Sequence, residues 1–370
     1  MTELIKIKAE KWVNNGLCIG YYQGETYFIA GAIPNEEVKC ELVKNTSKLK
    51  LLSVREVVFP SEIRVSNDCE IFLKCGGCQF RHISYLEELK VKEDLLRKEL
   101  YYKKDIKIVS SESENYRNNV QLKTQGNRIG FFQSGSNTLV DFPKYGCKNL
   151  SNELNSFILN PKNTTFSKEF KLRLSETGVV DYSKKISMLR IGEYVFEIPI
   201  NGFFQVNRFL ISNWIKEIRS LLPKTKVEFV ELFSGCGLIS ISISDLILKS
   251  TCMEIDKKSI EFSKKNSIRN EKKNLKFIQS DLYSSQNNVE NFSAKHWIVN
   301  PPRNGLGREI FRLFEKCKPE LLIYSSCNYV TLARDLKFFF QLGYKITDIS
   351  LFDFFPRTHY FETLVKIERK

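Results

Sequence analysis

The chain lacks any long uninterrupted hydrophobic run. Its most apolar stretch, Leu238–Leu248, contains several serines and Asp245, and it is shorter than the ~20 apolar residues that a membrane-spanning helix needs. The first residues have no apolar segment followed by a cleavage site, so no secretory signal is visible. We therefore expect a cytoplasmic protein that does not enter a membrane. Wholesale disorder is excluded as well, because 42% of the 370 residues are hydrophobic.

Acidic residues are in deficit. The chain has 43 Asp and Glu against 57 Lys and Arg, which gives a formal net charge of +14. A basic surface suits a polyanionic partner such as nucleic acid. An AT-rich genome, which favours Lys and Asn codons, explains the same excess equally well, so charge alone does not identify the partner.

The pattern of apolar residues predicts three domains in a multi-domain α/β protein. Residues 1–58 alternate apolar and polar positions between closely spaced turns, which predicts a small OB-like β-barrel. Such a barrel binds oligonucleotides in some proteins and is purely structural in others. Residues 59–200 are predicted to form an α+β domain with a cysteine cluster, a helix over 84–102 and later strands. Those strands are expected at 119–124, 128–133, 171–174 and 194–200.

Residues 201–370 alternate short apolar runs with amphipathic segments, which predicts a doubly wound, Rossmann-like sheet. The expected strands are 227–232, 250–253, 275–278, 297–299 and 321–324. The expected helices are 238–248, 259–269, 307–316 and 331–342. A ligand of such a sheet lies over the carboxyl ends of its strands, so the residues that follow each strand are the candidates for function.

Four strand ends carry a consistent set of side chains. The first is followed by the glycine-containing turn 231–237, and the next three by Glu254, Asp281 and Asn300-Pro301-Pro302-Arg303. A carboxylate at the second strand end is placed to hydrogen-bond ribose hydroxyls. This arrangement resembles the class I S-adenosylmethionine (SAM) methyltransferases. A dinucleotide dehydrogenase fits less well because no G-x-G-x-x-G is present.

The fifth strand end delivers Ser325-Ser326-Cys327-Asn328, and Asp353 and Glu362 lie among aromatic residues near the end of the sequence. Carboxylates among aromatic residues are expected to be at least partly buried. A thiol and a carboxylate together suit one methyl transfer in particular. Carbon 5 of uracil becomes nucleophilic only after a thiolate adds to carbon 6, and a base must then remove the carbon-5 proton.

Cysteines also cluster outside this domain, as Cys69, Cys75 and Cys78 with Cys147 further along. Four thiolates suit either a tetrahedral zinc ion or a [4Fe-4S] cluster, and their spacing does not decide between the two. The C-x3-C-x2-C spacing of radical-SAM enzymes is absent, so cleavage of SAM by a cluster is not expected.

With these motifs in place, nearly the whole chain resembles the RNA 5-methyluridine (uracil-C5) methyltransferases. The resemblance is to the iron–sulfur branch that modifies bacterial 23S ribosomal RNA. The segment 28–34 resembles the family's RNA-binding TRAM domain, and the segments 116–118 and 130–131 resemble motifs of its central domain. The segments 203–207, Ser326-Cys327-Asn328 and 331–335 match its catalytic-domain motifs.

The resemblance implies a role for each matched residue. It implies Cys327 as the nucleophile and Glu362 as the base. The implied SAM contacts are Gln205, Phe233, Glu254, Asp281 and Asn300. The implied [4Fe-4S] ligands are Cys69, Cys75, Cys78 and Cys147.

The sequence departs from the family pattern at two positions. Asn300 stands where the family usually has Asp before Pro-Pro-Arg, and Tyr329 stands where it usually has Pro. Transfer RNA is the alternative substrate, and we expect the protein to be a monomer. Two other functions fit the sequence less well. An amino-group methyltransferase would leave Cys327 and Glu362 without a role, and a non-catalytic RNA-binding factor would not need them.

Overall fold

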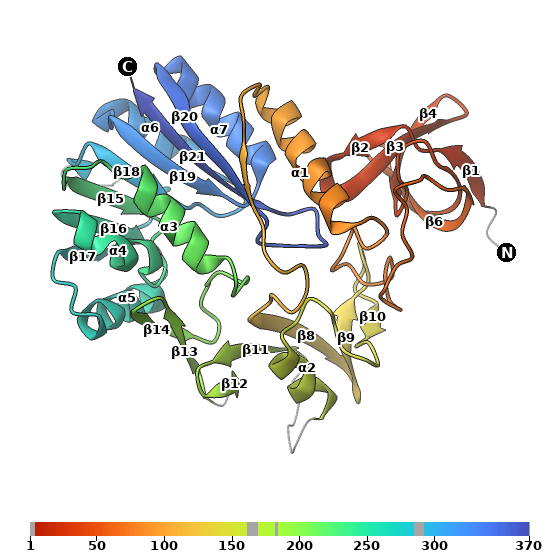
Figure 1. Ribbon diagram of the computed structural model, residues 1–370, viewed down its shortest axis with the longest axis horizontal. Helices are drawn as coiled ribbons and strands as arrows, with labels where there is room; N and C mark the ends of the chain where they lie inside the picture. Colours follow the sequence, from red (N-terminus) through yellow and green to blue (C-terminus); the bar gives the residue numbers. More distant parts are fainter. Residues whose placement is uncertain (1–3, 161–168, 182–183, 285–291, 370) are drawn as a thin grey trace.

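A computed structural model describes residues 4–160, 169–181, 184–284 and 292–369. The predicted domain ranges 1–58, 59–200 and 201–370 also contain residues 1–3, 161–168, 182–183, 285–291 and 370, which lie outside the described residues. Figure 1 shows a small barrel at one end of the molecule and a large sheet at the other, with a second, smaller sheet between them. The fold is a multi-domain α/β fold, as the sequence predicts.

The N-terminal part is a six-stranded sheet in the order β1-β5-β6-β4-β3-β2. Its strands are β1 (Ile5–Lys8), β2 (Lys11–Val13), β3 (Leu17–Tyr22), β4 (Glu25–Ala30), β5 (Glu37–Asn45) and β6 (Lys50–Phe59). The two edge strands β1 and β2 follow each other directly in the chain, so the edges meet and the sheet closes into a barrel. A hydrogen bond from Glu10 N to Ile19 O (2.8 Å) lies at this seam. The barrel interior holds residues from the alternating apolar positions, among them Ile7, Cys18, Ile29, Val38 and Leu52.

The middle of the chain holds one long helix and a second sheet. Helix α1 (Tyr85–Leu100) begins at Ser84, whose hydroxyl accepts the backbone N–H of Glu87 (3.2 Å), and ends at Tyr101 in a left-handed conformation. The sheet has the order β10-β9-β8-β11-β12. Its strands are β8 (Asn119–Gln125), β9 (Arg128–Phe132), β10 (Leu139–Asp141), β11 (Glu169–Ser175) and β12 (Gly178–Val180), and helix α2 (Asn152–Leu159) packs on it.

The C-terminal part is built on an eight-stranded sheet in the order β17-β16-β15-β18-β19-β21-β20-β7. The strands are β15 (Glu228–Leu232), β16 (Lys249–Glu254), β17 (Leu275–Gln279), β18 (His296–Val299), β19 (Leu321–Ser326), β20 (Tyr344–Phe352), β21 (Glu362–Arg369) and β7 (Lys107–Val109). The strands from β17 to β19 are parallel, and β21 runs antiparallel to both β19 and β20. All parallel neighbours therefore present their carboxyl ends at the same edge of the sheet.

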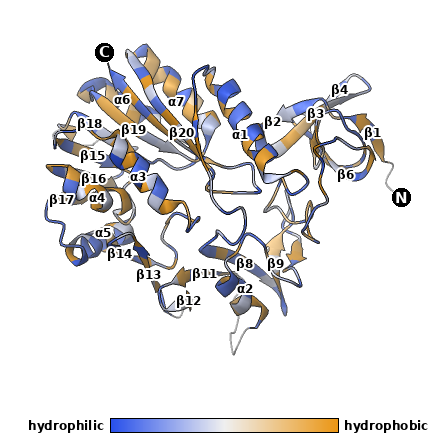
Figure 2. Cartoon of the chain, viewed as in Figure 1, coloured by the Kyte–Doolittle hydropathy of each residue, from blue (hydrophilic) through white to orange (hydrophobic). Residues whose placement is uncertain are grey.

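Helices cover both faces of the large sheet, and each face has its own core. Helices α3 (Ile211–Leu221), α4 (Leu238–Ile243) and α5 (Lys257–Arg269) share one buried cluster. Helices α1, α6 (Arg308–Cys317) and α7 (Tyr329–Gln341) share the other. Figure 2 shows the central strands mainly in hydrophobic colours, while α1 and α3 alternate between polar and apolar residues. This is the pattern expected for strands buried on both faces.

Two features differ from the expected elements. The predicted helix 238–248 ends early at Ile243 and continues as a 3-10 turn, Ser244–Leu246. The Ser244 hydroxyl bonds back to Ile241 O (2.9 Å), an alternative to helical hydrogen bonding. Helix α3 and strands β7, β20 and β21 were not predicted. The edge strand β7 has only three residues, and its partner β20 is far away in the sequence.

Both ends of the range 59–200 pack against the large sheet. Strand β7 pairs with β20, and α1 contributes to the core that α6 and α7 share. The hairpin β13 (Ile186–Ile191) and β14 (Tyr194–Pro199) lies on α5, where the side chain of Asn266 accepts the backbone N–H of Glu197 (2.7 Å). The boundaries at 58 and 200 stay predictions. Within the described residues, no helix is both long and apolar enough to span a bilayer.

Candidate active site and cysteine centre

A tight turn joins β15 to α4 and forms one wall of a pocket. Phe233, Gly235 and Gly237 all have positive φ angles, of 62°, 52° and 85°. At Gly237 a side chain is disfavoured for two reasons: the positive φ angle, and the position of a Cβ atom, which would lie 3.0 Å from Ile241 Cδ1 and 3.3 Å from the Phe277 ring. Within the turn, the backbone N–H groups of Ser234 and Gly237 donate to Met253 O and Ser234 O, at 3.0 and 2.9 Å.

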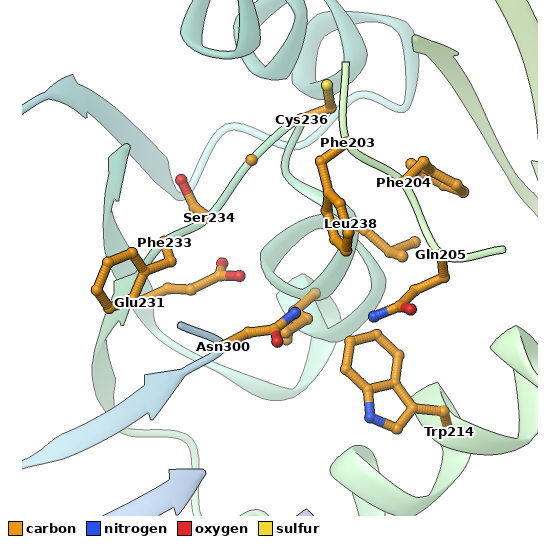
Figure 3. A pocket seen from close by; sticks show the side chains of 12 residues that line it. Phe203, Phe204, Gln205, Trp214, Glu231, Phe233, Ser234, Cys236, Leu238 and Asn300 are labelled. Atoms are coloured by element: carbon orange, nitrogen blue, oxygen red, sulfur yellow. The ribbon is translucent and has the colours of Figure 1, made fainter. Parts of the chain in front are cut away.

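We call the cavity at this turn the strand-end pocket. Figure 3 shows Glu231, Phe233 and Ser234 on one side of it and Gln205 and Trp214 on the other. The remaining lining residues are Phe203, Phe204, Gly235, Cys236, Leu238, Ile239 and Asn300. The pocket measures about 30 Å³ in this conformation, and Phe203 in its lining is 70% exposed.

Three of the five predicted SAM contacts, Gln205, Phe233 and Asn300, line the strand-end pocket. Glu254 does not line it, but its carboxylate accepts the backbone N–H of Gly235 (3.0 Å) and so borders the same turn. Asp281 follows β17 and accepts the backbone N–H of Tyr283 (2.9 Å). All five therefore lie along the carboxyl edge of the sheet, and three of them meet in one cavity.

Cys327 and Glu362 lie at adjacent positions of the sheet. Cys327 follows β19, and Glu362 is the first residue of β21, which pairs with β19. Burial, followed by the charge of Glu362, raises the pKa of the Cys327 thiol to about 12, while the nearby guanidinium of Arg303 opposes the shift. Burial also raises the pKa of Glu362 to about 7. The two groups are thus near enough to influence each other's ionisation.

A hydrogen-bonded chain links Glu362 to the strand-end pocket. The Ser325 hydroxyl donates to Glu362 Oε1 (2.5 Å), and Trp214 Nε1 donates to Ser325 Oγ (3.1 Å). Glu362 is only 2% exposed, and Trp214 lines the pocket. Sequence reasoning missed both Ser325 and Trp214. The serine lies two residues before Cys327, but the tryptophan comes from α3 and carries no recognisable motif.

The segment 331–335 holds the loop that follows Asn300. Asp335 is fully buried and accepts hydrogen bonds from Leu306 N (2.8 Å) and the Tyr324 hydroxyl (2.7 Å). Arg334 donates to the carbonyl oxygens of Asn304 and Leu306 (2.8 and 3.1 Å). This motif therefore fixes the loop that carries Arg303 beside Cys327.

Tyr329, one of the two departures from the family pattern, links three parts of the molecule. Its ring stacks on Phe361, next to Glu362, with centroids 4.9 Å apart and planes 12° from parallel. Its hydroxyl donates to Asn14 Oδ1 in the barrel (2.7 Å). The neighbouring Asn328 caps α7 by accepting the backbone N–H groups of Val330 and Thr331.

The four predicted cluster ligands surround a second cavity, of about 230 Å³, which we call the cysteine centre. It is lined by Cys69, Cys75, Cys78 and Cys147, brought together from two distant segments. The backbone N–H of Gly77 donates to Cys75 Sγ, and Asn149 Nδ2 donates to Cys78 Sγ, both at 3.3 Å. Across the described ranges, no three His, Cys, Asp or Glu side chains converge tightly enough to hold a single metal ion.

Arg81 lies beside the cysteine centre and was not expected from the sequence. Its side chain is 1% exposed and donates to Asp68 Oδ1 (2.8 Å) and Asn149 Oδ1 (2.6 Å). Asn149 in turn contacts Cys78, so a positive charge is connected to the sulfur atoms. Thiolates around an inorganic cluster would be stabilised by such a charge.

The large sheet has a doubly wound, Rossmann-like architecture with a cavity at the carboxyl ends of its parallel strands. A family model described as tRNA (Uracil-5-)-methyltransferase matches residues 136–370. A protein of Leptospira interrogans described as an uncharacterized RNA methyltransferase is 36% identical over 397 residues, covering 99% of this chain and 95% of the relative. The chain therefore belongs to the tRNA (uracil-5-)-methyltransferase family, and the predicted RNA uracil-C5 methyltransferase class is confirmed.

More distant relatives include proteins with named substrates. The 23S rRNA (uracil(1939)-C(5))-methyltransferase RlmD of Histophilus somni is 27% identical, covering 96% of this chain and 93% of that protein. The solved structure of the Pyrococcus abyssi tRNA (uracil-54, C5)-methyltransferase with S-adenosyl-L-homocysteine has a TM-score of 0.75 and 22% identity. It covers 98% of this chain and all of that one. This structural likeness shows the fold alone.

Proposed function

We propose that this enzyme uses SAM to methylate carbon 5 of a specific uridine in 23S ribosomal RNA. The observation that carries the proposal is the pairing of Cys327 with the buried Glu362 at neighbouring strands, one hydrogen-bonded chain away from the strand-end pocket. An amino-group methyltransferase needs neither group, and a non-catalytic RNA-binding protein has no use for a buried carboxyl beside a thiol.

The proposed reaction has three steps. The Cys327 thiolate adds to carbon 6 of uracil, and the electron pair of the ring double bond moves onto carbon 5 and its adjoining carbonyl. Carbon 5 then attacks the methyl group of SAM, whose sulfonium becomes a neutral thioether. Finally Glu362 takes the carbon-5 proton, the C–H electron pair restores the ring double bond, and the carbon–sulfur bond breaks to release the thiolate.

The electrostatic interaction between Cys327 and Glu362 suits a reaction in which the thiolate adds first and the carboxylate removes the proton last. Two negative charges at this buried position oppose each other, so ionisation of Cys327 and of Glu362 are coupled. Once the sulfur is bonded to carbon 6 its negative charge is gone, and Glu362 ionises more readily. The base is therefore available at the step in which it is needed. We infer that Arg303, which opposes the rise in the thiol pKa, supports the attacking thiolate.

The strand-end pocket is the proposed SAM site. Gln205, Phe233 and Asn300 line it, and Glu254 and Asp281 stand at the next two strand ends, where a ribose and an adenine edge bind in such sheets. When bound, SAM supplies the methyl group as an activated sulfonium. Asn300 keeps a hydrogen-bond acceptor where a carboxylate is usual, but not its negative charge.

We infer that the cysteine centre holds a [4Fe-4S] cluster through Cys69, Cys75, Cys78 and Cys147. The donor set suits it, because four thiols surround a cavity of about 230 Å³. A bound cluster would tie the segment 69–78 to the region around Cys147. The proposed RNA-binding element is the barrel, residues 1–58, and the chain is proposed to act as a cytoplasmic monomer.

The decisive experiment maps 5-methyluridine in total RNA from cells with and without the gene. Loss of 5-methyluridine at one position of 23S ribosomal RNA supports the proposal. Loss of 5-methyluridine only from transfer RNA would show that transfer RNA is the substrate instead. Unchanged 5-methyluridine in both RNAs contradicts the proposed function.

A second experiment tests the chemistry. Glu362→Gln should complete methyl transfer and then stall as an RNA–protein adduct that carries label from methyl-labelled SAM. The adduct should survive denaturing electrophoresis and disappear in the Cys327→Ala, Glu362→Gln double variant. Normal turnover by Glu362→Gln would show that another group, with Asp353 next in line, is the base.

A further inference from the structure

A charge-balanced cluster joins helix α1 to the loop 353–361, the segment that leads into Glu362. Lys92 Nζ lies 2.6 Å from Glu88 Oε1 and 2.7 Å from Asp353 Oδ1. Arg357 supplies the second positive charge, with Nη1 3.5 Å from Glu88 Oε2. The side chains of Lys92, Glu88 and Asp353 are all 0% exposed. Each charge on the loop therefore faces an opposite charge on α1.

The cluster also holds the backbone of the loop. Lys92 Nζ lies 3.3 Å from the carbonyl oxygen of Phe355, and Glu88 Oε1 accepts the N–H of Arg357 (2.7 Å). Lys92 is thus the centre of the arrangement, because it contacts one side chain of α1 and two points of the loop. Neutralising it would leave two carboxylates buried without a cation between them, which is the costly outcome for a buried ion pair.

The chain directly after Cys78 holds the other side of the same loop. The backbone N–H groups of Gln79 and Phe80 both donate to Arg357 O, at 2.9 and 3.1 Å. The side-chain oxygen of Gln79 accepts the N–H of His359 (3.2 Å). The loop is therefore attached to α1 and to the segment next to the cysteine centre, and neither belongs to the strands that carry Cys327 and Glu362.

The far end of the loop lies at the reactive groups. Tyr360 contacts Arg303, whose guanidinium carbon is 4.1 Å from the ring centroid and whose Nη1 donates to the Tyr360 hydroxyl (3.1 Å). Glu362 follows two residues later. A displacement of the loop by a fraction of an ångström would thus move the carboxyl relative to the carbon-5 proton, and proton transfer is sensitive to such a change.

We propose that Lys92 is a positioning residue for the proton-abstraction step, holding the loop 353–361 so that Glu362 reaches the carbon-5 proton. The inference rests on the proposed function of Cys327 and Glu362. Buried ion pairs add little net stability over well-packed apolar residues, but they impose a definite geometry. Lys92 acts through Asp353 and the loop backbone and touches neither the substrate nor the reacting atoms.

The test separates formation of the RNA–protein adduct from its resolution in single turnovers with methyl-labelled SAM. In Lys92→Met, adduct formation should stay within about threefold of wild type, while resolution into free methylated RNA slows about tenfold or more. The matched control is Lys90→Met on the same helix, because the Lys90 side chain is 68% exposed and pairs only with Glu87. It should leave both rates unchanged.

A second variant keeps the test decisive if Lys92→Met does not fold. Gln79→Ala removes the side-chain contacts to His359 and to Gly76 O (3.4 Å), and it should slow resolution about threefold without changing adduct formation. Equal losses in both steps, or unchanged resolution in a folded Lys92→Met or in Gln79→Ala, would overturn the inference. Failure of Glu362→Gln to accumulate adduct would instead contradict the proposed function, so the two failures are distinguishable.

Discussion

The candidate active site, with Cys327, Glu362 and the strand-end pocket, and the cysteine centre are assembled in opposite ways. Cys327 directly follows β19 and Glu362 begins β21, its paired neighbour, and one wall of the strand-end pocket is the turn between β15 and α4. The cysteines lie outside regular helices and strands, in the segment 69–78 and at Cys147. One site is positioned by backbone hydrogen bonds of a buried sheet, and the other by side chains and turns.

This difference predicts different consequences of mutation. A sheet with a core on both faces tolerates loss of a reactive side chain at its edge without losing its geometry. A centre built from loops gains much of its order from whatever its ligands bind, so ligand loss affects structure first. The loop 353–361 connects the two regions, because it contacts Gln79 on one side and carries Tyr360 towards Arg303 on the other.

The largest expected effect is that of Cys327→Ala. Without the thiolate no adduct forms at carbon 6, so methyl transfer to RNA should fall at least about 10³-fold, while the melting temperature changes by less than about 2 °C. Methyl incorporation and thermal denaturation measure the two quantities. The matched control is Cys317→Ala, a half-buried cysteine at the end of α6, which should keep its activity. Methylation of uridine by Cys327→Ala would contradict the thiol-addition mechanism.

Substitution at the cysteine centre should lower thermal stability more than it lowers activity. Protein purified without oxygen is expected to be brown and to hold about four irons. Cys78→Ser should lose that iron, and its melting temperature should fall by about 5 °C or more because the segment 69–78 loses its attachment. Activity should fall less than in Cys327→Ala. Stoichiometric zinc in place of iron, or full iron content in Cys78→Ser, would show that the assignment is wrong.

The pH dependence of adduct resolution should reveal the buried carboxyl. Since burial raises the pKa of Glu362 to about 7, the base form is lost as the pH falls through 7, and resolution should slow about tenfold per pH unit below that point. Ser325→Ala removes a hydrogen bond that favours the ionised form, so the profile should move to higher pH. A shift to lower pH, or a flat profile, would show that Glu362 is not the titrating group.

The smallest expected effect concerns the link between the barrel and the active site. Tyr329→Phe loses the hydrogen bond to Asn14 but keeps the stacking on Phe361, so the free energy of unfolding should fall by only about 1 kcal/mol. The turnover rate should change less than about threefold. Tyr329→Ala also loses the stacking, so its free energy of unfolding and its turnover rate should both be lower than those of Tyr329→Phe. Equal effects of the two variants would make the hydroxyl, rather than the ring, the important contact.

Much of the architecture and of the candidate site could be predicted because their signals are local. The helix over 84–102 begins at a serine and has apolar positions at helical spacing, and the structure has α1 at Tyr85–Leu100. Strand ends could be recognised from short apolar runs, which predicted that Phe233 and Asn300 lie at the carboxyl edge of the sheet. Gln205 was predicted from the resemblance to the family, and the structure shows that all three line one cavity. The burial of Asp353 and Glu362 followed from the aromatic residues around them and is confirmed at 0% and 2% exposure.

The sequence by itself determined the parallel sheet, because short apolar runs between amphipathic segments encode it, and it predicted Cys327, Glu362 and the four cysteines from residue type and from the resemblance to the family. Only the tertiary structure decided which distant groups meet. Lys92 and Asp353 are 261 residues apart in the chain, and Trp214 and Ser325 are 111 apart. No local pattern encodes such a contact. It arises when α1 packs on one face of the large sheet and α3 on the other, since burial of apolar surface brings the polar partners together and excludes water from between them.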